Sequence, residues 1–264
     1  MIEVQLSAGA HRDARFRLRS LRGCDEAMAG EPDAFAATRL LERLLVDADG
    51  APPEADTAWR LPLSDRDRLL AEVYRHHFGD AVESSADCDA CGEPFDLRFS
   101  LDALLQQLEE ERSRAPVPDG AGVYTLTDGV RFRLPSAADQ RDVQGLPAEQ
   151  AGVALLRRCV VGGGEAVDAR ETVDALEAAM EQAGPLLDQD LPAACPHCGH
   201  EQAVRFDIQD HLLAVLQHER GFLVREVHCL ARAYGWSLDE ILELPRADRR
   251  AYARLIQAEG RSRP

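Results

Sequence analysis

Hydrophobic and polar residues alternate in two similar stretches of the chain. Residues 15–19 read Arg-Phe-Arg-Leu-Arg, and residues 130–134 read Val-Arg-Phe-Arg-Leu. A period of two predicts strands with one buried face. Asp128-Gly129 separates the second stretch from the apolar residues 123–126. Because Asp-Gly favours a tight turn, residues 123–134 are predicted to form a β-hairpin.

Segments with helical periodicity follow each of these stretches. The leucine-rich residues 40–46 and 155–161 are predicted helices. A second helix is predicted over residues 64–79, with Ser64 as its N-cap and Gly79 at its exit. Further on, two Cys-x-x-Cys-Gly motifs each precede a β-type segment and another leucine-rich helix.

Three of these blocks occur twice in the same order. The RFRL words at residues 15–18 and 131–134 are 116 positions apart, the two leucine-rich helices are 115 apart, and the two cysteine motifs are 107 apart. Similar spacings in one order predict an internal duplication. Each half is expected to run strand, helix, helix, cysteine knuckle, strand, helix, with the Pro- and Gly-rich residues 113–122 as the boundary.

The C-terminal residues 210–264 form a predicted helical tail without a counterpart in the first half. One long helix is expected from Asp210 to about Ala233, ended by Gly235. Ser237-Leu-Asp-Glu240 is a capping box, and Trp236 is placed to pack against Ile241. Pro245 opens the last helix. Its apolar face is predicted from Ala251, Leu255 and Ile256, and its other faces carry Arg246, Arg249, Arg250 and Arg254.

The net charge of the chain limits the kinds of molecule that it is expected to bind. The chain has 264 residues, 45% of them hydrophobic, which suffices for a sizeable core. Its net charge is −17, so general binding to nucleic acid or to an anionic membrane surface is not expected. From Glu219 onward, nine Arg face seven acidic residues, so the tail alone is slightly basic. A protein partner fits this balance best.

Targeting signals are not recognised in the sequence. The N-terminus has no basic leader followed by an apolar stretch, and the longest apolar runs are too short to span a bilayer. We therefore expect a cytoplasmic protein. In a reducing compartment, cysteines in Cys-x-x-Cys pairs point to metal or redox chemistry before structural disulfides.

The two cysteine motifs predict a structural zinc site. A tetrahedral four-cysteine site takes two thiolates from each of two tight turns, and a glycine after each turn lets backbone amides reach the sulfurs. The predicted ligands of one Zn²⁺ ion are Cys88, Cys91, Cys195 and Cys198. The expected fold is therefore α+β and mainly helical, with two duplicated halves that share a split zinc ribbon, plus the tail. The predicted segments are residues 1–112, 123–209 and 210–264.

Other chemistry is less well supported. Cys195-Pro-His-Cys198 also suits a redox motif, but a redox pair opens a helix, whereas both motifs here lead into a strand. His197 and His200 flank the second motif and could replace a cysteine ligand. Four thiolates leave zinc no open position, and the sequence contains no phosphate-binding loop or nucleophile elbow. We expect no catalysis and no small-molecule substrate.

Several segments together resemble a known family. LSDRDRLLAEVYRHHFGD (63–80), the two CxxCG knuckles and YGWSLDEILELPRADRRAYARLI (234–256) are similar to zinc-knuckle proteins encoded with contractile phage tails and extracellular contractile injection systems. That family is related to the baseplate hub assembly chaperones of T-even phages. The resemblance covers residues 60–110 and 190–260. It implies a non-enzymatic assembly chaperone or minor structural component that binds a baseplate or hub protein.

The tail is the predicted partner-binding segment, because Trp, Tyr and Arg dominate interface energetics. An alternative is a zinc-ribbon protein that binds nucleic acid or regulates transcription, using Arg15, Arg17, Arg19, Arg131 and Arg133 as basic strand faces. The acidic residues between these arginines argue against it. The candidate partner-binding residues are Tyr234, Trp236, Arg249, Arg250 and Tyr252.

Overall fold

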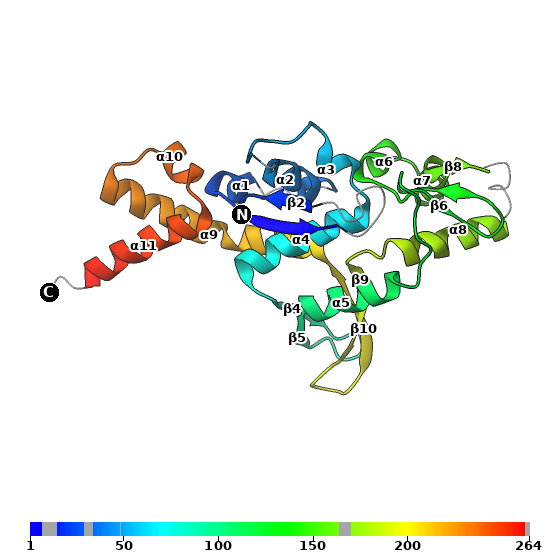
Figure 1. Cartoon of the computed structure of the whole chain (residues 1–264). Coiled ribbons are helices and arrows are strands. Elements are labelled where there is room, and N and C mark those ends of the chain that lie inside the picture. Colours follow the sequence, from blue (N-terminus) through cyan, green and yellow to red (C-terminus); the bar gives the residue numbers. More distant parts are fainter. Residues whose placement is uncertain (7–14, 29–33, 48, 164–169, 262–264) are drawn as a thin grey trace.

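A computed structural model describes residues 1–6, 15–28, 34–47, 49–163 and 170–261. The fold is α+β, about half helical, with four small antiparallel sheets among these residues. Figure 1 shows an elongated molecule with a central body, a second module on one side, a helical tail on the other and two hairpins below. No helix of the described residues is both long and apolar enough to cross a bilayer.

The central body is built from the first third of the chain. The strands are β1 (Ile2–Gln5), β2 (Arg15–Leu18) and β3 (Leu45–Val46), and the helices are α1 (Gly23–Met28), α2 (Ala36–Leu44), α3 (Thr57–Arg60) and α4 (Leu63–Phe78). The sheet has the order β1-β2-β3. It shares one core with buried leucines of two helices of this segment, α2 and α4, of the later helix α5 (Leu101–Arg112) and of the first half of the long helix α9 (Ile208–Tyr234).

The second module repeats a three-stranded sheet with helices beside it. The predicted hairpin of residues 123–134 is confirmed, with shorter strands, and its own small core includes Phe132, Leu156 and Cys159. The strands are β6 (Tyr124–Thr125), β7 (Arg131–Phe132) and β8 (Val160–Gly162), and the helices are α6 (Ala137–Asp142), α7 (Ala148–Cys159) and α8 (Arg170–Ala183).

Each cysteine knuckle lies at the turn of a two-stranded hairpin. The predicted element order lacked the strand before each knuckle. Burial alternates along these strands, but their inward positions carry small or polar residues such as Ser84 and Gln189, so the hydropathy of the sequence does not show the period of two. The first hairpin pairs β4 (Ala81–Asp87) with β5 (Pro94–Ser100) and leads into α5 (Leu101–Arg112); the second pairs β9 (Asp188–Ala194) with β10 (Glu201–Asp207) and leads into α9.

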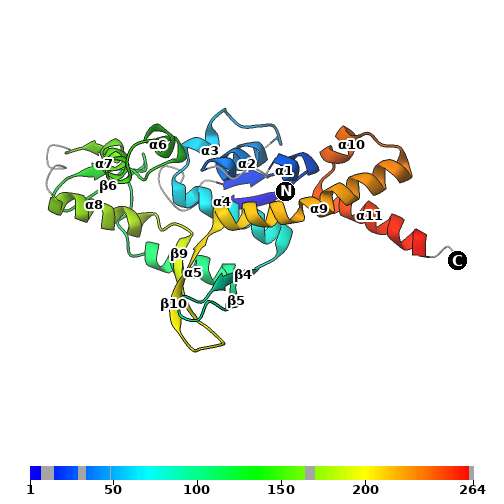
Figure 2. The same ribbon diagram turned by 180° about the vertical axis from the view of Figure 1, so that it is seen from behind.

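The tail matches its predicted elements closely. From behind, Figure 2 shows α9 running from the hairpins past α4 to the far end of the molecule, where the chain turns back into α10 (Leu238–Glu243). The last helix, α11 (Arg246–Arg261), then starts beside α9 near the central body and runs outward again. Gly235 ends α9 with a φ of 70°, and both hydrogen bonds of the Ser237–Glu240 capping box are present. The 3.6-residue period and the cap residues together were sufficient to locate this segment.

The predicted N-cap of α4 is wrong. The helix begins at Leu63 after Pro62, and Ser64 lies inside its first turn with a buried hydroxyl that has no hydrogen-bond partner among the described residues. A tertiary contact sets this start, because the Leu63 N–H donates to the Pro135 carbonyl at 2.9 Å. The predicted exit at Gly79 is confirmed, with a φ of 93°.

One arginine–aspartate pair holds each sheet to the helix that follows it. In the central body, Arg19 donates twice to Asp25, at 2.6 and 2.9 Å. In the second module, Arg133 donates twice to Asp139, at 2.6 and 2.8 Å. Both carboxylates are buried, so each bidentate pair compensates the cost of burying the charge.

The spacing of these equivalent contacts corrects the alignment of the RFRL words. The Arg–Asp pairs are 114 positions apart, not 116. A second arginine pairs with each of these carboxylates, Arg43 with Asp25 and Arg158 with Asp139. These two arginines are 115 positions apart, which is the spacing of the two leucine-rich helices in the sequence. The RFRL words at 15–18 and 131–134 are therefore offset by two residues. A shift of two keeps the same face of a strand inward, which is why the word match was misleading.

The tail does have a counterpart in the first half, contrary to the expectation from sequence. Both segments consist of a short helix, a Leu-Pro dipeptide and a longer helix with Asp-Arg in its first turn. We call them the first Leu-Pro unit (α3 and α4) and the second Leu-Pro unit (α10 and α11). Their dipeptides, Leu61-Pro62 and Leu244-Pro245, are each extended at the leucine, with ψ of 143° and 138°.

The two Leu-Pro units dock in the same way on the two modules. The first unit contacts the second module, where Arg66 donates to Gln140 at 3.2 Å. The second unit contacts the central body: the Arg246 N–H donates to the Leu21 carbonyl at 2.7 Å, and Arg249 donates to Glu26 at 2.9 Å. Glu26 and Gln140 are again 114 positions apart. Each module therefore receives a Leu-Pro unit at the same place.

Two arginines of α11, Arg246 and Arg249, point inward, whereas the sequence analysis placed them away from the apolar face of the helix. Arg246 and Arg249 are 3% and 0% exposed. Arg249 pairs with both Glu26 and Glu226, so three elements meet at one guanidinium. Among the residues expected on the apolar face, Leu255 is exposed, and Ala253 is buried in its place. Burial of matched charges thus rotates α11 relative to its hydrophobic pattern.

Replacing Arg249 with Met tests this contact. Met keeps much of the volume but leaves two buried carboxylates short of a cation, so we expect a loss of about 3 kcal/mol in the free energy of unfolding. Urea unfolding followed by circular dichroism measures it. Arg254→Met, an exposed change on the same helix, is the control and should stay within about 0.5 kcal/mol of wild type. Equal stability of both variants would refute the role of Arg249.

Candidate metal centre

The structure brings the four predicted cysteine ligands together. Cys88 and Cys91 come from the turn between β4 and β5, and Cys195 and Cys198 from the turn between β9 and β10. All four sulfurs lie within 4.8 Å of one another. The Sγ–Sγ distance is 3.6 Å from Cys88 to Cys198 and 3.8 Å from Cys91 to Cys195. Both of these contacts join one hairpin to the other.

The backbone of each knuckle is folded in the same way. Gly92 and Gly199 have φ of 74° and 75°, a region that L-residues with side chains rarely adopt. Their N–H groups donate back to the carbonyls of Cys88 and Cys195, at 2.8 and 2.9 Å. The glycines predicted to fold each turn over its sulfurs thus have that conformation.

Side chains hold the two hairpins against each other at both ends of their strands. At the ends next to α5 and α9, away from the knuckles, the rings of Phe99 and Phe206 meet edge to face, with centroids 4.9 Å apart. The other contact lies beside the sulfurs. Gln202 bridges the hairpins by accepting from the Asp89 N–H and donating to the Asp87 carbonyl, both at 3.0 Å. These contacts fix the relative position of the two turns, and hence the spacing of the sulfurs.

The thiols of the cluster do not ionise independently. The Cys91 N–H is directed at the Cys88 sulfur and lowers the pKa of this thiol to about 6. At Cys91 the Glu93 N–H also acts to lower the pKa, but loss of solvent and the adjoining thiols outweigh it and raise the pKa to about 12. Several thiolates this close repel one another, so a bound cation would stabilise the fully ionised form.

The arrangement fits a closed tetrahedral metal site. With a metal–sulfur distance of about 2.3 Å, a tetrahedron requires its sulfurs to be roughly 3.8 Å apart. The two sulfur–sulfur distances between the hairpins, 3.6 and 3.8 Å, are close to this value. Four sulfur donors favour soft or borderline ions over calcium and magnesium. A redox role fits less well, because neither motif opens a helix in the structure.

The neighbouring histidines are placed outside the sulfur cluster. His197 and His200 are exposed, and His200 contributes backbone groups only: its carbonyl accepts from the Cys195 N–H at 2.8 Å, and its N–H is directed at the Cys198 sulfur. In the part of the chain that the structure describes, the only group of His, Cys, Asp and Glu that could hold a metal is the four cysteines. The sequence prediction of these four ligands is therefore compatible with the geometry.

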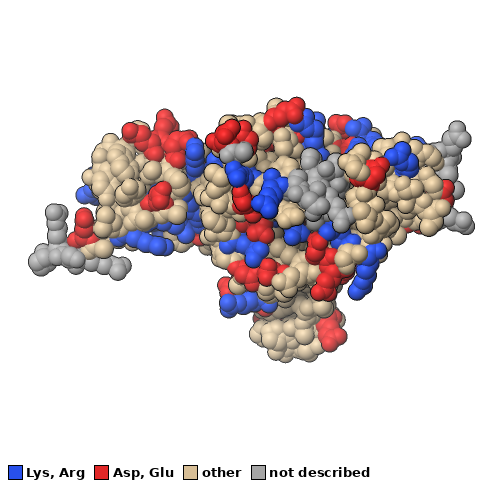
Figure 3. All heavy atoms as spheres, in the orientation of Figure 1, with Lys and Arg blue, Asp and Glu red and all other residues tan. Residues whose placement is uncertain are grey.

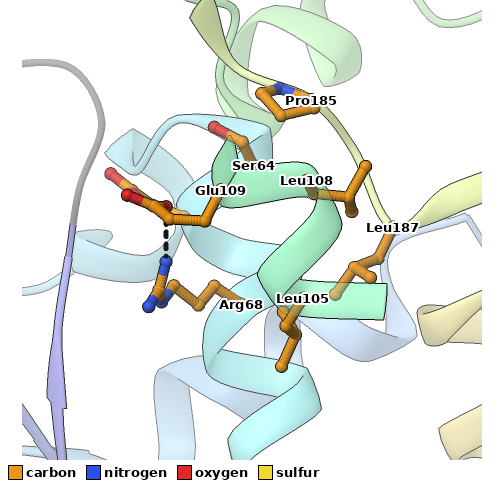
Figure 4. A pocket seen from close by; sticks show the side chains of 8 residues that line it. Ser64, Arg68, Leu105, Leu108, Glu109, Pro185 and Leu187 are labelled. Carbon is orange, nitrogen blue, oxygen red and sulfur yellow. Dashed lines mark hydrogen bonds and ion pairs between the residues drawn. The ribbon is translucent and has the colours of Figure 1, made fainter. Parts of the chain in front are cut away.

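A pocket beside the hairpins is too small for an organic substrate. It lies between α4, α5 and the segment before β9, with a volume of about 30 Å³, and Arg68 bonds Glu109 at its edge (Figure 4). That volume suits a single water molecule. Ser64, whose hydroxyl has no hydrogen-bond partner in the described part of the chain, lines it.

The predicted partner-binding residues divide into two groups. Tyr234, Trp236 and Tyr252 form an aromatic cluster, with Trp236 stacked on Tyr234 at 4.8 Å and meeting Tyr252 edge to face at 5.4 Å. Both tyrosines are exposed, at 41% and 39%. Arg250 is partly exposed and pairs with Glu219, whereas Arg249 is fully buried in an internal contact. The structure thus leaves the aromatic cluster and Arg250 accessible, but not Arg249.

Comparison of the chain with models of protein families, with curated proteins and with solved structures found no match. The chemistry of the site therefore rests on its own geometry.

Removing one sulfur donor tests the metal centre. We expect Cys198→Ser to reduce the free energy of unfolding by at least about 4 kcal/mol, since structural zinc contributes about 10–16 kcal/mol in small peptides. A chelator should destabilise wild type to a similar extent and leave the variant unchanged. Urea unfolding with and without chelator measures both effects. Cys229→Ser, outside the cluster, is the control; a chelator-insensitive wild type would contradict the site.

Proposed function

We propose that the four cysteines bind one structural Zn²⁺ ion that joins the two halves of the chain. The supporting observation is the convergence of four sulfurs from turns separated by 103 residues. Zinc accepts four thiolates in a tetrahedron without an open position, so the ion would not activate water. A scaffold, not an enzyme, is the function that such a closed site supports.

We also infer that the two halves are copies of one ancestral unit, sharing a split zinc ribbon. The buried Arg–Asp pairs and the module residues that receive each Leu-Pro unit recur 114 positions apart, and the knuckle turns recur 107 apart, whereas the Leu-Pro dipeptides themselves are 183 apart. The sulfur contacts also exchange under this relation, because Cys88 with Cys198 corresponds to Cys195 with Cys91. Such a pseudo-twofold arrangement is what two related units around one ion would produce.

The biological role that we propose is assembly of a contractile injection system baseplate. The chain would act in the cytoplasm as a non-enzymatic assembly chaperone or minor structural component that binds a baseplate or hub protein. The sequence resemblance supplies this proposal, and its segments include α4, both knuckles and the tail. The exposed aromatic cluster of Tyr234, Trp236 and Tyr252 gives the tail a surface of the composition that dominates interfaces.

Nucleic-acid binding is the competing hypothesis, and the ion pairs weigh against it. Four of the five strand arginines considered for it are paired with carboxylates of the same chain: Arg17 with Glu3, Arg19 with Asp25, Arg131 with Asp119 and Arg133 with Asp139. Paired arginines do not form the uniform positive stripe that phosphate neutralisation requires.

Particle assembly in the native host tests the proposed role. Cells in which Trp236→Ala and Tyr252→Ala replace the natural residues should yield at least about tenfold fewer contractile particles by electron microscopy, and the chain should lose its co-purifying baseplate protein. Arg232→Ala, an exposed change on α9, is the matched control and should assemble normally. Normal particle numbers in a strain that lacks the whole chain would refute the role, as would DNA or RNA retention in place of a protein partner.

A further inference from the structure

An open groove runs between α9 and α11 in the tail, where the two helices lie side by side (Figure 1). Its volume is about 420 Å³. Phe222, which is 46% exposed, and the small Ala253 supply apolar surface. Arg225, Arg250, Arg254 and Gln257 also line it. The groove therefore combines apolar surface with several cationic side chains.

The electrostatic balance of this groove is positive. Its two carboxylates are already engaged: Glu219 pairs with Arg246 and Arg250, and Glu226 with Arg249 and Arg250. Among the described residues, neither Arg225 nor Arg254 has an ion-pair partner, and both are exposed. The Arg225 guanidinium lies 5.7 Å from the centroid of the Phe222 ring. In Figure 3, basic side chains form a band between this end and the central body, while acidic ones gather over α10.

The first Leu-Pro unit shows what covers the equivalent helix face. Counting from the shared Leu-Pro dipeptide, Leu70 and Tyr74 of α4 correspond to Ala253 and Gln257 of α11. In α4 this face is buried, and the Tyr74 ring lies 5.0 Å from the ring of His211 on α9. In α11 the same face borders the open groove. In the first Leu-Pro unit, α9 covers this face of α4. In the second unit, the equivalent face of α11 leaves room for another element.

We propose that the α9–α11 groove binds an acidic amphipathic helix of a partner protein. This inference rests on the proposed protein-binding function and names the site and the chemistry of the partner. The apolar side of such a helix would pack on Phe222 and Ala253, as in other helix-in-groove complexes. Its carboxylates would pair with Arg225 and Arg254, which can each donate two hydrogen bonds to a carboxylate and have no ion-pair partner among the described residues.

Selection from a peptide library tests the groove directly. The full-length, metal-loaded chain is immobilised, and random 16-residue peptides are selected on it by display. The expected winners carry Asp or Glu together with Leu or other large apolar residues at helical spacing. Fluorescence anisotropy then gives their dissociation constants. Binding should weaken at least tenfold for R225E/R254E, and should stay within twofold of wild type for R220E/R232E, which makes the same charge change elsewhere on α9.

Several outcomes would overturn the proposal. These are failure to enrich any peptide, enriched peptides without acidic residues, and equal binding to both double variants. Light scattering of the chain alone adds another: dimers that R225E/R254E dissociates would make a second copy of this chain the occupant. Circular dichroism confirms that both variants are folded. Particle assembly, which reads the Trp236 and Tyr252 surface, is a separate measurement, so a failed groove does not by itself refute the proposed function.

Discussion

The packing of the two halves depends on how the charge on four clustered cysteine sulfurs is balanced. The sulfurs lie within 4.8 Å of one another although 103 residues separate the two knuckles. Closing a loop of that length costs roughly 4 kcal/mol of chain entropy, and thiolates at this spacing repel one another. The binding free energy of a structural zinc ion, about 10–16 kcal/mol in small peptides, exceeds that entropic cost. A bound ion would fix the two hairpins relative to each other, and with them the helices α5 and α9 that follow them.

A second constraint is the burial of arginine with carboxylates at each module. Arg19 and Arg133 hold their aspartates, and Arg249 joins α1, α9 and α11 through Glu26 and Glu226. Such charges are costly to bury, and removing one partner costs more than the pair contributes. They therefore favour one docking geometry over others. Each module binds a Leu-Pro unit through residues at equivalent positions. In the central body this contact holds the C-terminal tail against α1.

Sequence reasoning predicted the features that have local signals. The long helix α9, the capping box at Ser237 and the four cysteine ligands each follow from residue spacing within a short window. The strands before the knuckles were missed because their inward positions carry small or polar residues, so hydropathy does not follow the alternation in burial. The start of α4 and the inward side of α11 are set by contacts with distant segments, which no local pattern encodes. The two-residue slip in the RFRL alignment arose because a shift of two residues keeps the same face of a strand inward.

X-ray absorption at the zinc edge of natively purified protein is the most direct measurement of the central claim. Four sulfur neighbours at about 2.3 Å, with one zinc ion per chain, are the predicted result. Absence of bound zinc, or a coordination shell in which nitrogen or oxygen replaces the sulfurs, would contradict an ion held between the two hairpins.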